Sequence, residues 1–236
     1  MHMKPIQLAV FDMAGTTVYD NGNVAEAFVN AFKHFGLTIG QEAATRVMGY
    51  RKKEAIRLLL DEQGILVPAS DHELVERVHD QFIQQMIAYY EHTPDLKEQR
   101  GAGDLFRWLQ SEHIQVALNT GFVKAITDTI LRRLGWHEHP AINAVISSDE
   151  VPNGRPFPDM IYTLMEKTGV TEKTAVLKIG DTVVDMLEGK NAGCGLVVGI
   201  TAGAGRRAEL EAVGPHHIID TLDELPFILV KTKVSV

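Results

Sequence analysis

Several polar side chains that could carry out chemistry stand at the ends of apolar runs. Asp12 closes the run "LAVFD" (8–12), and Thr120 closes "VALNT" (116–120). Asp181 follows "AVLKIG" (175–180), Asp185 comes shortly after it, and Arg155 lies in "NGRPFPD" (153–159). Because a short apolar run indicates a buried parallel strand, its end lies at the sheet edge where open α/β sheets bind ligands. The sequence therefore predicts one crevice that collects these side chains.

The two strand-end aspartates suggest metal-assisted phosphoryl chemistry. The carboxylate of Asp12 could attack phosphorus as a nucleophile. The carboxylate oxygens of Asp12 and Asp181 are hard ligands suited to Mg²⁺, which takes few carboxylates and keeps water and phosphate oxygens as its other ligands. A cation is needed because an anionic nucleophile and an anionic phosphoryl group repel each other. We therefore expect Mg²⁺ as cofactor and a small anion that carries a phosphoryl group as substrate.

The residues around these aspartates suit the binding of phosphoryl oxygens. The backbone amides near Ala14 and Gly15, the hydroxyls of Thr16 and Thr120, and the cation of Arg155 could each hold one. The Thr16 hydroxyl has an alternative role in stabilising a turn. Asp185 could likewise be a solvated carboxylate in the first turn of a helix, where the helix dipole favours it.

Strands and helices alternate along most of the chain, which predicts an α/β fold with a doubly wound parallel sheet. Helix-like stretches separate most of the expected strands, and several of these stretches close with glycine, a common C-terminal signal. The expected strands are "LAVFD", "HIQVALNTG" (113–121), "AINAVISSDEV" (141–151), "AVLKIGD" (175–181), "GLVVGIT" (195–201) and "HHIID" (216–220).

Residues 20–98 break this alternation. They hold apolar residues at three- and four-residue spacing, which is typical of amphipathic helices. A helical insert directly after the first strand predicts an all-α cap domain (20–98) over the catalytic edge of an α/β core (1–19 and 99–236). The linkers would be "YDNGN" (19–23) and "TPDLKEQRGAG" (93–103).

Composition restricts the protein class and its partners. The 236 residues are 45% hydrophobic and carry a net charge of −8, which argues against a nucleic acid or an anionic membrane as partner. No apolar stretch approaches the ~18 residues of a membrane span. The single cysteine, Cys194, excludes an internal disulfide and fits a reducing cytoplasm. We expect a cytoplasmic monomer or homodimer.

Taken in order, these segments resemble the haloacid dehalogenase superfamily and, within it, the phosphonatase branch. The usual first motif of the superfamily is Asp-x-Asp-x-Thr/Val, and "DMAGT" (12–16) is the Asp-x-Ala-Gly-Thr form of phosphonatase-like enzymes. The segment "NGRPFPD" offers arginine where the superfamily usually has lysine, and "KIGDTVVDMLEGKNAG" (178–193) looks like the metal-binding motif of the branch. The resemblance covers nearly the entire chain, including the helical insert.

The resemblance implies a role for each matching residue. Asp12 would form an aspartyl-phosphate that water then hydrolyses. Mg²⁺ would be held by Asp12, the carbonyl of Ala14 and Asp181, with Asp185 as a further ligand or an orienting group. Thr120 and Arg155 would act on the transferred group as catalytic residues. Substrate contacts would come from Gly15, Thr16, Asn119, Gly121 and Arg51.

Ala14 implies an unusual leaving group. In ordinary members a second aspartate at this place protonates an alkoxide leaving group and later activates water. Phosphonatase instead uses a cap lysine that forms a Schiff base with phosphonoacetaldehyde. The segment "VMGYRKKEAI" (47–56) resembles its Met-Gly-x-x-Lys stretch and assigns that lysine to Lys52, whose pKa Arg51 and Lys53 would help to lower. Lys52 could instead bind a distal anion of the substrate or lie on a solvated basic helix face.

Three departures from the branch keep several functions open. Ala55 stands where phosphonatase has a histidine, Phe122 where it has a tyrosine, and Gly22 where a small polar residue is expected. One hypothesis is a phosphonatase-like hydrolase, and a second is a phosphatase of small phosphomonoesters, similar to phosphoglycolate phosphatase, without imine chemistry. A third is a catalytically silent ligand-binding protein on the same fold.

Overall fold

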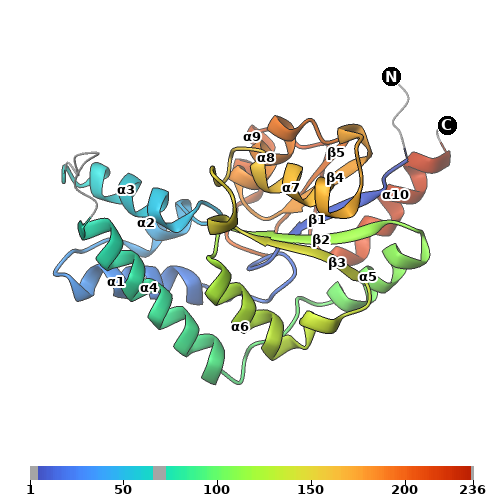
Figure 1. Ribbon diagram of the computed structural model, residues 1–236. Coiled ribbons are helices and arrows are strands. Elements are labelled where there is room, and N and C mark those ends of the chain that lie inside the picture. The colour runs from blue at the N-terminus through green and yellow to red at the C-terminus, as the bar shows by residue number, and fades with distance from the viewer. Residues whose placement is uncertain (1–4, 66–72, 235–236) are drawn as a thin grey trace.

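The protein is a parallel sheet covered by helices, with a helical lobe at one end. Its structure is a computed structural model that describes residues 5–65 and 73–234 (Figure 1). The six strands are all parallel, in the order β3-β2-β1-β4-β5-β6, which confirms the predicted doubly wound α/β fold. They are β1 (Leu8–Asp12), β2 (Gln115–Thr120), β3 (Ile142–Ser147), β4 (Val176–Gly180), β5 (Leu196–Ile200) and β6 (His217–Ile219).

The central strand β1 is buried on both faces, as its apolar sequence predicts. Leu8 and Val10 belong to one hydrophobic core, whereas Ala9 and Phe11 belong to the other. This division follows from the alternation of side chains along a strand. The chain passes from β1 to β2 and β3 on one side and returns to β4 on the other. The crevice expected at such a reversal therefore lies at the carboxyl ends of β1 and β4.

Helices cover both faces of the sheet. Figure 1 shows α7, α8 and α9 over one face, and α5, α6 and α10 on the opposite side. Both termini lie at the end of the molecule away from the helical lobe. These helices are α5 (Ala102–Ser111), α6 (Lys124–Leu134), α7 (Asp159–Thr168), α8 (Val183–Ala192), α9 (Arg207–Ala212) and α10 (Leu225–Val234).

The remaining four helices form the predicted all-α cap. Helix α4 packs against α1 and α3 and also against α6 of the core. Edge-to-face contacts link Phe28 to Phe32 and Phe82, with centroids 5.6 and 5.2 Å apart. No strand occurs among residues 20–65 and 73–98, the described part of this region, although Glu98 forms an isolated bridge with Val18 of the core. The cap helices are α1 (Asn23–His34), α2 (Gln41–Arg46), α3 (Lys52–Glu62) and α4 (Glu73–His92).

The two chain segments that join core and cap pair with each other. The amide of Tyr19 donates to the carbonyl of Lys97 at 3.1 Å, and the amide of Gln99 donates to the carbonyl of Thr17 at 2.7 Å. The chain thus leaves and re-enters the core at one point, as a hinge requires. This pairing supports our proposal that the cap spans residues 20–98.

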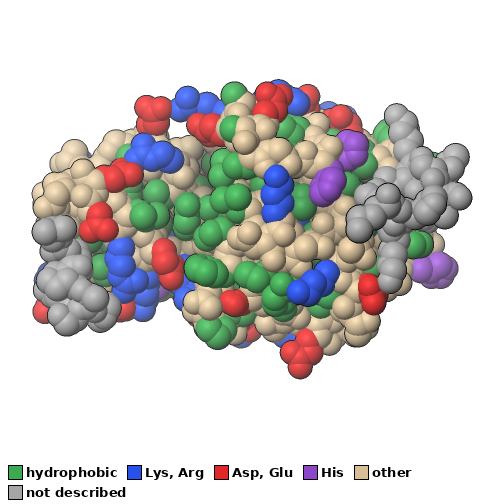
Figure 2. Space-filling view, turned by 90° about the horizontal axis from the view of Figure 1, so that it is seen from above, with side chains coloured by type: hydrophobic (Ala, Val, Ile, Leu, Met, Phe, Trp, Pro, Cys, Tyr) green, Lys and Arg blue, Asp and Glu red, His purple; other side chains and the backbone are tan. Residues whose placement is uncertain are grey.

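The structure adds some elements that the sequence pattern did not predict. The expected third strand (141–151) ends at Ser147 and continues as a short 3₁₀ turn over Ser148–Glu150. Helix α10 was not predicted either. Residues 71 and 72, the start of an expected cap helix, lie outside the described residues. Within the described chain, we find no helix that combines the length and apolarity of a membrane span. On the face seen in Figure 2, acidic and basic side chains are interspersed, with hydrophobic side chains between them.

Candidate active site

The structure brings the strand-end residues together, as the sequence predicts. Asp12 is the last residue of β1, Thr120 is the last residue of β2, and Asp181 directly follows β4. Arg155 reaches the same place from the loop between β3 and α7. Asp12, Thr120 and Asp181 are at most 5% exposed, so any chemistry here takes place away from bulk water.

A small cavity lies between these residues and the cap. Its volume is about 30 Å³, room for roughly two water-sized groups. Core and cap both contribute to its wall, so the cavity exists only while the cap lies over the sheet edge. The lining residues are Asp12, Ala14, Asp20, Val24, Met48, Gly49, Lys52, Thr120, Gly121, Phe122, Asp181, Thr182 and Ala204.

The guanidinium of Arg155 holds the carboxylate of Asp12. The Nη1 group donates to Asp12 Oδ1 at 2.6 Å, and the side chain of Arg155 is fully buried. Its other N–H groups donate to the carbonyl of Gly49, to the carbonyl and Oδ1 of Asn119, and to Glu188. Since all five donors have acceptors in the protein, direct contact with a transferred group would require one of these bonds to be given up.

A second buried cation, Lys178, completes this network. Its Nζ lies 2.8 Å from Oδ1 of Asn119, 2.8 Å from Oδ1 of Asp185 and 3.2 Å from Oε2 of Glu188. The side-chain amide of Asn119 donates to both oxygens of Glu188 at 2.9 Å. Asn119, the register partner of Asp12 on the neighbouring strand, is held in this network and does not line the cavity, although we expected it to contact substrate.

Asp185 is buried, and its surroundings favour the ionised form. Arg155 Nη1 lies 3.2 Å from Asp185 Oδ1, and Thr182 donates to Oδ2 from its hydroxyl at 2.5 Å and from its amide at 3.2 Å. Burial alone would raise the pKa of Asp185, but Arg155 and Lys178 lower it below the usual value. The solvated first-turn carboxylate considered from the sequence is therefore wrong, because this side chain is fully buried.

Unlike Asp185, Asp181 has surroundings that disfavour its ionised form. Its carboxylate accepts hydrogen bonds from the hydroxyl of Thr16 at 3.0 Å and from the amide of Ala204 at 2.7 Å. Burial, together with the nearby carboxylates of Asp12 and Asp185, raises its pKa well above the usual range. A bound cation would remove this repulsion. Gly15 faces the same carboxylate, and a Cβ there would come within 2.6 Å of Asp181 Oδ2.

The three aspartates fit a divalent cation. Each of Asp12, Asp181 and Asp185 offers an oxygen within 4.8 Å of the others, and all three are buried. Among the described residues, this buried cluster and its neighbour Glu188 hold four carboxylates, and Arg155, Lys178 and Lys52 are buried cations near them. Burial and the neighbouring carboxylates disfavour the ionised form of Asp181, and a divalent ion would offset this effect.

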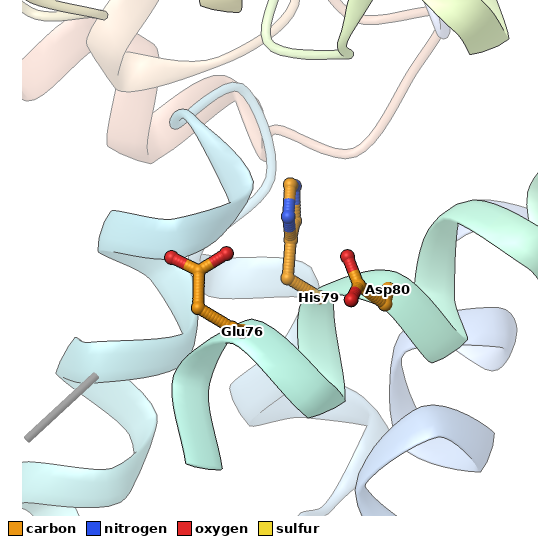
Figure 3. Close-up of side chains that lie close together, drawn as sticks. All are labelled: Glu76, His79 and Asp80. Atoms are coloured by element: carbon orange, nitrogen blue, oxygen red, sulfur yellow. The ribbon is translucent and has the colours of Figure 1, made fainter. Parts of the chain in front are cut away.

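A second group of possible ligands on the cap is less suited to hold a metal. Glu76, His79 and Asp80 project from α4 at positions i, i+3 and i+4, with the imidazole between the two carboxylates (Figure 3). The carboxylate of Glu76 is already paired with Lys53, whose Nζ lies 2.6 Å from Oε2. We therefore assign the candidate metal site to the aspartate cluster.

Lys52 is the cap residue that enters the cavity. It begins α3, is 3% exposed, and its Nζ donates to the carbonyl of Tyr50 at 3.3 Å. The rings of Phe122 and Phe28 lie 5.6 and 6.0 Å from Nζ. Burial, with a smaller contribution from Arg155, lowers the pKa of Lys52 to about 8 against the opposing effect of Asp12. A solvated basic helix face is excluded for this residue.

Arg51, the neighbour of Lys52, lies elsewhere than expected. It was predicted to bind substrate and to lower the pKa of Lys52. Instead its guanidinium donates to the carbonyls of Ser148, Val151 and Pro152 in the core loop after β3. Because these carbonyls belong to the core, Arg51 ties the cap to the core.

Three residues of the site were missed at the sequence level. Lys178 could have been found from the sequence, since a lysine inside an apolar strand that is buried on both faces needs a partner. Nothing in the sequence pattern pointed to Glu188 or Asp20. Glu188 lies in a helix of mixed composition, and Asp20 lies in the polar segment "YDNGN" that was read as a linker.

The fold and this site define a class of protein. A family model described as haloacid dehalogenase-like hydrolase matches residues 9–198, and the chain belongs to that family. The chain is therefore a hydrolase, and its fold and buried aspartates are those that its sequence motifs predict.

More specific similarities point to the phosphonatase branch. A phosphonoacetaldehyde hydrolase of Bordetella pertussis is 31% identical over 98% of this chain and 94% of that protein. One from Latilactobacillus sakei is 29% identical over 97% of each. The crystal structure of a phosphonoacetaldehyde hydrolase-like protein from Oleispira antarctica has a TM-score of 0.83, with 25% identity over 98% of this chain and 93% of that one. A predicted phosphoglycolate phosphatase from Haemophilus somnus shares the fold, with a TM-score of 0.75, 19% identity and coverage of 96% and 99%.

Proposed function

We propose that the protein is a Mg²⁺-dependent hydrolase of a small phosphonate similar to phosphonoacetaldehyde. In this proposal Asp12 is the nucleophile and forms an aspartyl-phosphate, while Lys52 forms an imine with the aldehyde carbon of the substrate. The observation that carries the proposal is the placement of Lys52 and Asp12 in the wall of one cavity of about 30 Å³. Because this space holds only about two water-sized groups, the cap must open to admit such a substrate, and the closeness of the two side chains favours a short one.

The chemistry of the leaving group supports this assignment. Ala14 also lines the cavity and offers no acid to protonate an oxygen leaving group. A protonated imine on Lys52 draws electrons from the carbon–phosphorus bond, so its cleavage does not need that acid. Imine formation requires a neutral amine, and the pKa of about 8 makes this form accessible near neutral pH.

The other residues of the site orient the nucleophile and neutralise charge. Arg155 and Lys178 hold Asp12 and its neighbouring carboxylates in place, with Asn119 between them. Asp12, the carbonyl of Ala14, Asp181 and Asp185 would hold Mg²⁺, which supplies positive charge to the phosphoryl oxygens. Thr16, Thr120 and the amides near Gly15 and Gly121 would contact the transferred group.

Borohydride trapping combined with phosphate release tests the proposal. We expect phosphonoacetaldehyde and Mg²⁺ to give phosphate release, and added borohydride to leave a two-carbon adduct on Lys52 detectable by mass spectrometry. Lys52→Arg should abolish both signals, and Asp12→Asn should abolish phosphate release while leaving the adduct. Phosphate release from Lys52→Arg at the parent rate would refute the imine mechanism.

A phosphomonoesterase without imine chemistry is the second candidate. Ala55 and Phe122 favour it, because both are apolar at positions where phosphonatase has a histidine and a tyrosine. Phosphoglycolate turnover without any adduct on Lys52 would identify this activity. A ligand-binding protein without catalysis would release no phosphate from either substrate, and Asp12→Asn would equal the parent. We further propose a cytoplasmic location, supported by the single cysteine.

A further inference from the structure

A carboxylate on the cap side of the cavity has no role in the chemistry described so far. Asp20 lines the cavity together with Lys52, Val24 and Phe122. Asp20 directly follows Tyr19 of the paired hinge segments. It therefore lies at the start of the cap and not on a strand of the sheet. The carboxylates of Asp12 and Asp181 face the metal end, so Asp20 is the acidic group at the end where the organic part of a substrate would lie.

The backbone fixes the orientation of this carboxylate. Oδ1 of Asp20 accepts hydrogen bonds from the amides of Asn23 at 3.0 Å and Val24 at 3.4 Å, the first residues of α1. These bonds cap the helix and hold one oxygen in place. Burial raises the pKa of Asp20 above its usual value although both amides oppose this change, so the protonated form is more accessible than for an exposed aspartate.

Among the described residues, positions that carry acid–base side chains in related enzymes are apolar here. Ala14, which lines the cavity, stands in place of the usual acid, and Ala55 is buried. Phe122 has no proton to transfer. Besides Asp20, Tyr90 of α4 is a titratable group near this end, but burial raises its pKa well above the usual range and makes it a weak acid.

We propose that Asp20 is the general acid–base for imine exchange at Lys52. This inference rests on the proposed function and deepens it. After Nζ of Lys52 has added to the aldehyde carbon, the carbinolamine oxygen receives the proton of Asp20. The carbon–oxygen bond breaks, water leaves, and the nitrogen lone pair forms the protonated imine, with Asp20 left as carboxylate. When water later attacks the product imine, Asp20 takes that proton back.

The test follows the imine step without any phosphoryl transfer. The parent protein is incubated with acetaldehyde and cyanoborohydride, and the rate at which Lys52 becomes ethylated is followed by mass spectrometry. Asp20→Asn keeps an oxygen acceptor for the two amides but cannot transfer a proton. We expect it to slow ethylation about 100-fold at an unchanged Tm. Tyr90→Phe, the matched control, should ethylate at the parent rate.

The outcomes separate this inference from the proposed function. Equal ethylation rates for Asp20→Asn and the parent would overturn the role of Asp20 while the imine mechanism stands. Loss of ethylation in Tyr90→Phe but not in Asp20→Asn would assign the proton transfer to the tyrosine and overturn our inference too. Absence of ethylation in the parent would overturn the imine mechanism and this inference together.

Discussion

Asp181 is the residue whose state depends most on a bound cation. Burial and the carboxylates of Asp12 and Asp185 disfavour its ionised form. We expect Mg²⁺ to stabilise the parent by about 2.7 kcal/mol at a concentration of 100 Kd. Asp181→Asn should lose this effect and, without Mg²⁺, unfold at a higher temperature than the parent. Thermal unfolding with Mg²⁺ or chelator measures both quantities.

A matched variant separates the metal site from general charge effects. Asp61 is exposed on α3, so Asp61→Asn should keep the full Mg²⁺-dependent rise in Tm. If Asp181→Asn kept the rise as well, the aspartate cluster would not be the metal site.

The side chain of Lys52 should react as an unusually acidic amine. Burial lowers its pKa to about 8, so the neutral amine becomes the main form as pH rises through 8. Isocyanic acid, the protonated and reactive form of cyanate, is small and carbamylates only neutral amines. We expect the carbamylation rate constant of Lys52, expressed per unit of isocyanic acid present at each pH, to rise with a midpoint near pH 8 in the folded protein. The same residue in denaturant should show a midpoint near ~10.4. Equal midpoints in both states would contradict the buried position.

The strand pattern predicts residues of this site where they lie at the end of a strand, whereas Arg155, Asp185 and Lys52 were assigned from sequence motifs. Asp12, Thr120 and Asp181 were found because an apolar run points to each. The direction of the Arg51 side chain could not be predicted, since it depends on where the cap lies over the core. The network role of Arg155 likewise depends on Asn119, Lys178 and Glu188, which converge from separate segments of the chain.

At the scale of elements, the contact between α3 and the loop after β3 holds the cap closed. Arg51 donates to three core carbonyls. Gly121 of the core also lets the cap backbone at Tyr50 come close, because a Cβ at position 121 would lie 2.6 Å from the carbonyl oxygen of Tyr50. Arg51→Ala should therefore lower kcat/KM by roughly 10- to 100-fold by misplacing Lys52. Amide hydrogen exchange should become faster at residues 49–52 and 148–152.

The adjacent cation supplies the control for that variant. Lys53 pairs with Glu76 on the partly exposed side of the cap, and such pairs contribute about 0–1 kcal/mol. Lys53→Ala should leave both kcat/KM and exchange near parent values. If the two variants behaved alike, the Arg51 contacts would have no special part in closure.

Helix α4 should make the cap sensitive to acid through His79. Burial, assisted by Lys53 and opposed by Glu76 and Asp80, lowers the pKa of His79 from 6.5 to about 4 (Figure 3). The unfolded chain thus binds this proton at a higher pH than the folded chain, so stability falls as pH drops from 6.5 to 4. The loss is on the order of 3 kcal/mol. Urea unfolding across this range should show a smaller loss for His79→Gln, and the full loss for His137→Gln, an exposed control.

The pattern of whole elements was more predictable than their ends. Periodic apolar residues identified the described cap helices, because each buries one face against its neighbours. Helix α10 was missed because "LPFILV" (225–230) is apolar without a helical period. The turn at Ser148–Glu150 shortened the expected third strand because the side chain of Glu150 accepts the amide of Ser147 and ends the strand there.

For the whole molecule, cap placement over the sheet edge creates two adjacent cavities of different size. The smaller one holds Asp12 and Lys52. The larger one, about 360 Å³, lies between α2 and the segments that begin α8 and α9. Met48, Thr182 and Ala204 line both, so these residues form the partition between them. In the closed form, the three residues of this partition therefore limit the size of the substrate, although the two cavities together have more room.

Removing the side chain of Met48 should join the cavities and change which substrates fit. Met48→Ala should raise kcat/KM for p-nitrophenyl phosphate at least roughly 10-fold relative to a two-carbon substrate, since a methylene-scale change in a pocket is worth about 1–3 kcal/mol. Val184 lines only the larger cavity, so Val184→Ala should leave the ratio unchanged. Because Met48 is 7% exposed and its loss costs stability, both variants are assayed below their measured Tm. An unchanged ratio in a folded Met48→Ala protein would mean that cap opening, not the partition, limits substrate size.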